Sequence, residues 1–350
     1  MDLRGKNLVD WLRKQPSDKF PGCKSYIHRY DSVEEFLTRE VHPLVATGAA
    51  LVDGIFLNDH GPGHITTVIQ RATELVAAKA CALSPYEVYL LLAAIQVHDV
   101  GNILGRKGHE TQPGKLYGQM EERLGNETIE KRMILTIAEA HGGSVNGDKD
   151  TIVRLEPTDT ILGKPIRPRL LAALLRFADE LADDRTRAAR FAADHGVLPE
   201  NSRIFHKYSE ALHSVIVDIK GRAIDLHFEI SDTDARLRFP KEAKEVYLLD
   251  EIIERTLKMH RERVYCTRFM RPEITLDRVN AKITVYASPT PEAPYTAELI
   301  KIGYRLEDRG YPDSAYGVCD MCPELKAWHN GAPLSGDALV AILEDKRKET

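Results

Sequence analysis

The chain has 350 residues, of which 43% are hydrophobic, and its formal net charge is −5. This length and composition allow a sizeable core in one large or two smaller domains, and the acidic balance excludes a global field that would attract nucleic acid. No apolar run is long enough to cross a bilayer, and the first fifteen residues lack the apolar core of a secretion signal. We therefore expect a cytoplasmic protein without a membrane partner.

Five cysteines are an odd number in a large chain, which argues against a disulfide framework and for a reducing compartment. Cys319 and Cys322 have the spacing of a metal knuckle, and His329 follows closely, but a second pair of ligands is absent. We interpret them as ordinary reduced cysteines.

Three regions follow one another along the chain. Residues 1–198 predict a helical domain, because apolar residues return every three or four positions. Residues 199–290 predict an α+β unit. Two alternating segments around Lys220-Gly221-Arg222 indicate a hairpin, and a helix from about Lys241 to Cys266 precedes further strand-like alternation from Glu273 to Tyr286. Residues 291–350 predict a tail of short helices. The expected fold class is mainly α, with a helical bundle followed by a small α+β unit and this tail.

An unusually apolar helix is predicted after Ser84. Ser84-Pro85-Tyr86-Glu87 has the form of a capping box with proline at the first helical position. From Val88 to Val97 only Tyr89 and Gln96 carry polar groups, so this helix should be buried, and it delivers His98 and Asp99 into the interior. Burying such a pair without partners costs about 2–7 kcal/mol per polar group, and more for a charge. A divalent metal is the simplest compensation.

Other helices supply residues of the same kind. His64 lies on the same helix face as Val68 and Ala72, and Asp179 lies on the same helix face as Leu171 and Leu175. Both faces are apolar stripes, so we expect these two side chains to point into the core. Two further candidates are His141, at the end of a helix before two glycines, and His109, in a loop.

Taken one at a time, these residues have ordinary explanations. A histidine on an apolar stripe is often a hydrogen-bonded core residue, and Asp179 could pair with Arg176. Taken together, they would need a separate set of hydrogen-bond partners for each residue, whereas one metal centre accounts for all of them. We therefore favour the metal centre.

The order His64, His98-Asp99, Asp179 resembles the signature of the HD-domain metal-dependent phosphohydrolase superfamily, over roughly residues 50–190. His109 and His141 look like the extra histidines of members that hold two metals, in which Asp99 would bridge the ions. The resemblance implies that His98 and Asp99 are catalytic, and that one or two divalent transition metal ions bind. Ligands without thiolate suit Mn, Fe, Ni or Zn. The implied metal ligands are His64, His98, Asp99, His109, His141 and Asp179.

One branch of the superfamily is excluded by its motifs. The branch that cleaves cyclic di-GMP normally has lysine where this chain has Asn102, and its GYP motif is absent here.

Several residues near this signature are candidates for substrate binding. The Gly-Pro-Gly turn before His64 would hold His60 near the site, unless His60 is a loop histidine satisfied by backbone. Arg106 and Lys107 could bind a substrate phosphate or could be solvated loop charges. Arg176 lies beside the predicted site and is a further candidate for phosphate contact.

The expected function is hydrolysis of a phosphoester or phosphoanhydride in a small phosphorylated, nucleotide-like substrate by a metal-activated hydroxide. One alternative is an HD-type nuclease acting on single-stranded DNA or RNA, for which only the region from Arg185 to Arg190 offers a basic track. A second is a regulatory protein that senses a nucleotide and acts through a protein partner. The sequence leaves the oligomeric state open, including a homo-oligomer.

Overall fold

The fold of the chain was obtained as a computed structural model, in which the residues divide into two compact units. Unit 1 comprises Met1–Ala182 and Tyr265–Thr275, and unit 2 comprises Asp183–Val264 and Leu276–Thr350. Within these units the structure describes residues 3, 5–49, 61–77, 81–104, 128–142, 148–183, 199–241, 244–288, 297–308 and 317–349.

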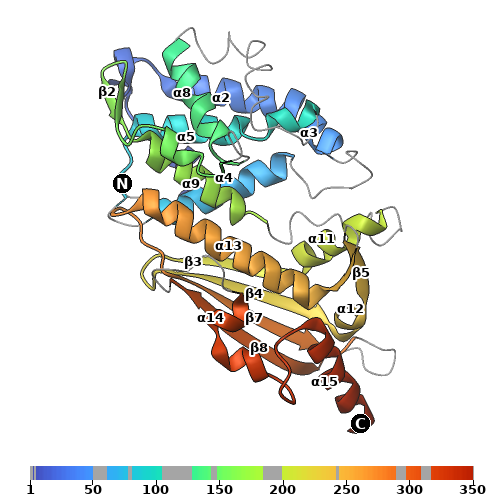
Figure 1. Cartoon of the computed structure of the whole chain (residues 1–350). Helices are drawn as coiled ribbons and strands as arrows, with labels where there is room; N and C mark the ends of the chain where they lie inside the picture. Colours follow the sequence, from blue (N-terminus) through green and yellow to red (C-terminus); the bar gives the residue numbers. More distant parts are fainter. Residues whose placement is uncertain are drawn as a thin grey trace. The chain divides into compact units, whose positions relative to one another are not determined.

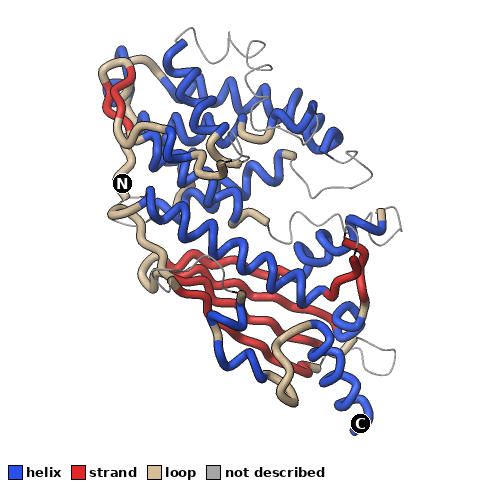
Figure 2. The backbone as a smooth tube through the Cα atoms, in the orientation of Figure 1, coloured by secondary structure: helices blue, strands red, loops and turns tan. Residues whose placement is uncertain are grey.

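In its described residues, unit 1 is helical apart from one small hairpin (Figures 1 and 2). The apolar helix predicted after Ser84 is confirmed as α5, with Ser84 as its N-cap and both bonds of the capping box with Glu87 present. α5 packs against α1, α2, α4, α8 and α9, so neighbours cover it on all sides, and this accounts for its apolar sequence. The helices of unit 1 are α1 (Leu8–Leu12), α2 (Tyr26–Phe36), α3 (His42–Ala49), α4 (Pro62–Val76), α5 (Pro85–Val97), α8 (Thr128–Glu139) and α9 (Pro168–Glu180).

Two elements of unit 1 were not expected. A short antiparallel hairpin of β1 (Asp159–Ile161) and β2 (Lys164–Ile166) interrupts the helical region, and Gly163 adopts the positive φ that its turn requires. A π-helical turn over Leu37–Val41 connects α2 to α3. Strands of three residues are too short to produce a recognisable alternation.

Unit 2 is built on a four-stranded sheet with the order β3-β4-β7-β8. β3 and β4 form the predicted antiparallel hairpin, β7 pairs in parallel with β4, and β8 pairs antiparallel with β7. The helix α13 lies along one face of this sheet (Figure 1), where Tyr304 on β8 donates a hydrogen bond to Thr256 on α13 at 3.2 Å. The strands of the sheet are β3 (Leu212–Asp218), β4 (Ala223–Ser231), β7 (Arg278–Tyr286) and β8 (Glu298–Glu307).

Smaller elements complete unit 2. α11 packs on β5, α12 packs on α15, and α14 packs on β8. These elements are α11 (Glu200–Ala211), α12 (Asp232–Arg236), β5 (Arg238–Lys241), β6 (Lys244–Tyr247), α13 (Leu248–Met270), α14 (Val318–Met321) and α15 (Gly336–Glu349). α13 contributes residues to unit 2 as far as Val264 and to unit 1 from Tyr265.

The structure corrects three expectations in this region while confirming the mainly α fold class. The helix expected from about Lys241 begins at Leu248, because residues 244–247 form β6 and pair with β5. The strand expected from Glu273 begins at Arg278. Residues 291–350 do not form a tail of short helices only, because they include β8, an edge strand of the sheet. Within the described residues no helix combines the length and apolar character needed to cross a membrane.

Candidate metal centre

Five side chains of unit 1 converge from four separate segments of the chain. His64 comes from the first turn of α4, His98 and Asp99 from the end of α5, His141 from the turn after α8, and Asp179 from the last turn of α9. Two overlapping groups have ligand atoms that all lie within 4.8 Å of one another: His64, His98 and Asp99 form one, and His98, His141 and Asp179 form the other. A cluster of this composition can bind a metal.

The two oxygens of Asp99 face different imidazoles. Asp99 Oδ2 lies 3.5 Å from His64 Nε2 and 3.4 Å from His98 Nε2, whereas Asp99 Oδ1 lies 3.9 Å from His141 Nε2. Asn102 donates a hydrogen bond of 3.0 Å to Asp99 Oδ1 and so fixes the rotation of the carboxylate. On the other side, Asp179 Oδ1 lies 3.1 Å from His64 Nε2 and 3.7 Å from His98 Nε2.

Backbone carbonyls determine which nitrogen of two histidines faces the cluster. His98 Nδ1 donates to the carbonyl oxygen of Ile95 at 2.8 Å, and His141 Nδ1 donates to that of Ala138. In a neutral imidazole the other nitrogen then carries a lone pair, so both Nε2 atoms present acceptors to carboxylates that are acceptors themselves. Acceptors that face acceptors in a buried site need a proton or a metal ion between them, and the five side chains offer ligands for a metal ion.

The charges of the cluster lead to the same conclusion. Burial lowers the pKa of His98, but the carboxylates of Asp99 and Asp179 outweigh burial and raise the pKa to about 9. Loss of solvation raises the pKa of Asp179, but the imidazoles of His64 and His98 outweigh it and hold that pKa well below its ordinary value. Both shifts show that the site stabilises positive charge at its centre.

Asp179 is the most exposed side chain of the cluster. The Asp179 side chain is 28% exposed, whereas that of Asp99 is 7% exposed and those of His64 and His98 are fully buried.

Comparison with known proteins places the chain in a family. The HD-CE family matches residues 50–258, which is more than half of the chain and spans all five converging residues. The chain belongs to the HD-CE family. This HD-type family confirms the resemblance read from the order His64, His98-Asp99, Asp179. No curated protein and no solved structure matches the chain.

Five of the predicted site residues of this HD-CE protein meet in the cluster, and the others have different positions. His60, Arg106, Lys107 and His109 lie outside the described residues. Arg176 lies one turn before Asp179 on α9 and donates hydrogen bonds to Thr151 and to the backbone of Lys149. Its predicted contact with substrate stays a prediction.

Two residues that support the site were not identified from the sequence. His42 is buried on α3 and donates from Nε2 to the carbonyl oxygen of Gln96 at 2.9 Å, two residues before His98. Thr151 donates to the carbonyl oxygen of Ala140 at 2.8 Å, next to His141. Neither residue belongs to a motif, because each donates a hydrogen bond to a backbone carbonyl of another segment of the chain.

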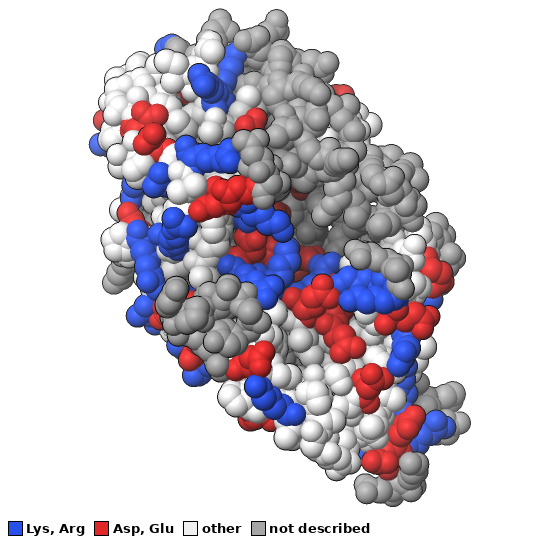
Figure 3. Space-filling view, viewed as in Figure 1, with Lys and Arg blue, Asp and Glu red and all other residues white. Residues whose placement is uncertain are grey.

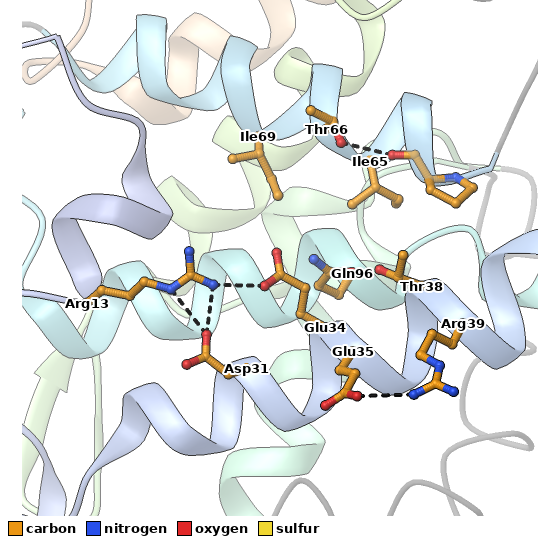
Figure 4. A pocket seen from close by; sticks show the side chains of 11 residues that line it. Arg13, Asp31, Glu34, Glu35, Thr38, Arg39, Ile65, Thr66, Ile69 and Gln96 are labelled. Carbon is orange, nitrogen blue, oxygen red and sulfur yellow. Dashed lines mark hydrogen bonds and ion pairs between the residues drawn. The ribbon is translucent and has the colours of Figure 1, made fainter.

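A cavity of about 530 Å³ lies elsewhere on unit 1, between α4 and α2 (Figure 4). Ile65, Thr66 and Ile69 of α4 form one wall, and charged side chains such as Arg13 and Glu34 form the other. Arg13 pairs with Glu34 at 3.1 Å across this wall. The residues that line the cavity do not include the five of the cluster, so its size does not make it the reaction site.

The cysteine pair near the C-terminus does not form a metal site in the described part of the chain. Cys319 Sγ contacts the carbonyl oxygen of Leu325, whereas Cys322 Sγ contacts that of Arg305. Both are free cysteines, as expected.

Proposed function

We propose that this HD-CE protein is a metal-dependent phosphohydrolase that cleaves a phosphoester or phosphoanhydride bond in a nucleotide-like substrate. The observation that carries the proposal is the convergence of three imidazoles and two carboxylates, whose ring nitrogens and carboxylate oxygens face one another. The HD-type family supports the same chemistry.

The cluster offers ligands for one or two divalent ions. His64, His98, Asp99 and Asp179 would hold one ion, and the second oxygen of Asp99, which faces His141, is suited to a bridging role. Ligands of nitrogen and oxygen without thiolate favour Mn, Fe, Ni or Zn. When bound, such ions neutralise phosphate charge and acidify water for in-line attack.

The residues of the chain itself then have separate tasks. The carbonyls of Ile95 and Ala138 hold the imidazoles of His98 and His141 in one tautomer, and Asn102 orients Asp99. Asp179, the most exposed of the five, lies where a phosphate would approach.

The charge distribution supports a small substrate over a nucleic acid. The formal net charge is −5, and on the face shown in Figure 3 Lys and Arg side chains lie among Asp and Glu side chains. Binding along a nucleic-acid backbone depends on a basic track. The arginines from Arg185 to Arg190 lie outside the described residues.

The test is hydrolysis by manganese-loaded protein of nucleotides, cyclic nucleotides, and single-stranded DNA and RNA. We expect release of phosphate or a nucleoside product from at least one small nucleotide, and loss of more than about 100-fold in rate for Asp99→Asn, which keeps the size but removes the ligand charge. His28→Ala, which removes an exposed imidazole on α2, is the matched control and should retain the wild-type rate.

Other outcomes of this panel would replace the proposal. Cleavage restricted to DNA or RNA would identify a nuclease. Nucleotide binding without turnover at any metal would identify a sensing protein instead.

A further inference from the structure

A second network of contacts lies behind the metal centre, and Thr151 is at its middle. The Thr151 side chain is buried, accepts a hydrogen bond from Arg176 Nη1 at 3.0 Å, and donates one to the carbonyl oxygen of Ala140 at 2.8 Å. Ala140 directly precedes His141. The hydroxyl therefore connects α9 to the turn that carries a candidate ligand.

Arg176 is held on three sides. Its guanidinium lies over the ring of Tyr265 at 4.5 Å from the centroid, and it also donates to the backbone oxygen of Lys149 at 3.4 Å. Arg176 is buried and stands one turn before Asp179 on the same helix. A charge buried this far needs such contacts, and they hold Arg176 against the segment that contains Thr151.

Tyr265 in turn fixes the segment on both sides of Thr151. Its hydroxyl donates to Asp150 Oδ1 at 2.9 Å and accepts from the backbone N–H of Ile152 at 3.0 Å. Burial raises the pKa of Tyr265 to about 12, so the hydroxyl keeps the proton that it donates. Arg268 adds an ion pair with Asp150 at 3.2 Å.

We propose that Thr151 and Arg176, supported by Tyr265, are positioning residues for the metal ligand His141. They hold the turn after α8 so that His141 Nε2 faces Asp99 Oδ1. This inference rests on the proposed function, because it requires that the cluster bind a metal. Tyr265 lies beyond the region matched by the HD-CE family, so residues outside that region help to build the site.

Metal affinity of the full-length protein tests the inference. Removing an outer partner of a metal ligand weakens metal binding by about 10- to 100-fold. We expect this increase in the Mn²⁺ dissociation constant for Thr151→Val, which keeps the shape of the side chain but not its two hydrogen bonds. Thr136→Val is the matched control, because Thr136 also donates to a backbone carbonyl, that of Arg132 on α8, but does not contact the cluster. Its dissociation constant should stay within about twofold of wild type.

A double-mutant cycle separates positioning from general destabilisation. In a His141→Ala background, Thr151→Val should cause no further loss of Mn²⁺ affinity, because the ligand that it positions is gone. Arg176→Lys provides a second variant, since lysine keeps the charge but lacks the planar fork that contacts Thr151 and Tyr265 together. It should weaken Mn²⁺ binding in the same direction as Thr151→Val.

The outcomes are distinct. An equal loss of affinity in the wild-type and His141→Ala backgrounds, or dissociation constants for Thr151→Val and Arg176→Lys that match Thr136→Val, would overturn the inference alone. Absence of Mn²⁺ binding by the wild-type protein would overturn the proposed function together with it.

Discussion

Glu130 on α8 is a buried carboxylate on which three tyrosines meet. It accepts hydrogen bonds from Tyr86 at 2.7 Å, from Tyr26 at 2.8 Å and from Tyr89 at 3.5 Å, and it pairs with Arg29 at 3.3 Å. These contacts tie α2 and α5 to α8. Replacement of Glu130 by leucine should therefore destabilise unit 1.

The contacts give the size of the effect. A hydrogen bond to a charged group contributes about 1.5–3 kcal/mol, so loss of the bonds from Tyr26 and Tyr86 costs about 3–6 kcal/mol. Part of this is offset because the variant no longer buries a carboxylate. We expect Glu130→Leu to lower the free energy of unfolding by about 3 kcal/mol, and Glu130→Gln, which keeps one acceptor oxygen, by about half as much.

Urea unfolding followed by tryptophan fluorescence measures this loss. In a Trp328→Phe background the remaining tryptophan, Trp11, belongs to α1 and reports on unit 1. Glu35→Gln serves as a control, because it breaks an exposed ion pair with Arg39 and should cost less than about 0.5 kcal/mol. A loss below about 1 kcal/mol for Glu130→Leu would refute the reasoning.

Two further predictions concern α5 and its surroundings. Burial lowers the pKa of His42, so below about pH 6.5 the unfolded chain binds a proton that the folded chain excludes. The free energy of unfolding therefore decreases as the pH is lowered. From pH 8 to pH 5, the thermal midpoint should fall less in His42→Gln than in the wild-type protein; equal falls in the two proteins would contradict the assignment. Ser84→Ala removes the hydroxyl that caps Glu87 N–H at 3.2 Å and should cost about 1 kcal/mol in urea unfolding, with no change expected if the cap is unimportant.

The parts of the fold that local sequence determines were predicted. Ser84 and Glu87 mark the start of α5, and the apolar run after them requires burial whatever surrounds it. The hairpin of β3 and β4 follows from alternation on both sides of Gly221. Both signals lie within a few residues of the element that they specify.

Elements that depend on distant pairing were missed. β8 alternates through Ile300, Ile302 and Tyr304, but residues 291–350 were expected to form a tail of short helices. Its partner β7 must be known before the alternation indicates a sheet. The strand β6 was assigned to a helix because only its pairing with β5 distinguishes it from the first turn of α13.

The candidate site shows the same division. The positions of His64 and Asp179 on apolar stripes, and of His98 at the end of a buried apolar helix, predicted that they point inward. The structure brings them together. Thr151 and Tyr265 are more than 100 residues apart, and no spacing relates them to each other or to His141. Such supporting contacts arise from the packing of the helices and leave no local pattern.

The central claim is that the five converging side chains bind a divalent metal. Elemental analysis of the wild-type protein and of a His98→Ala, Asp99→Ala variant, both purified without chelator, tests it most directly. We predict that the wild-type protein carries one or two equivalents of a transition metal and that the variant has lost it. Equal metal content in the two proteins would contradict the claim.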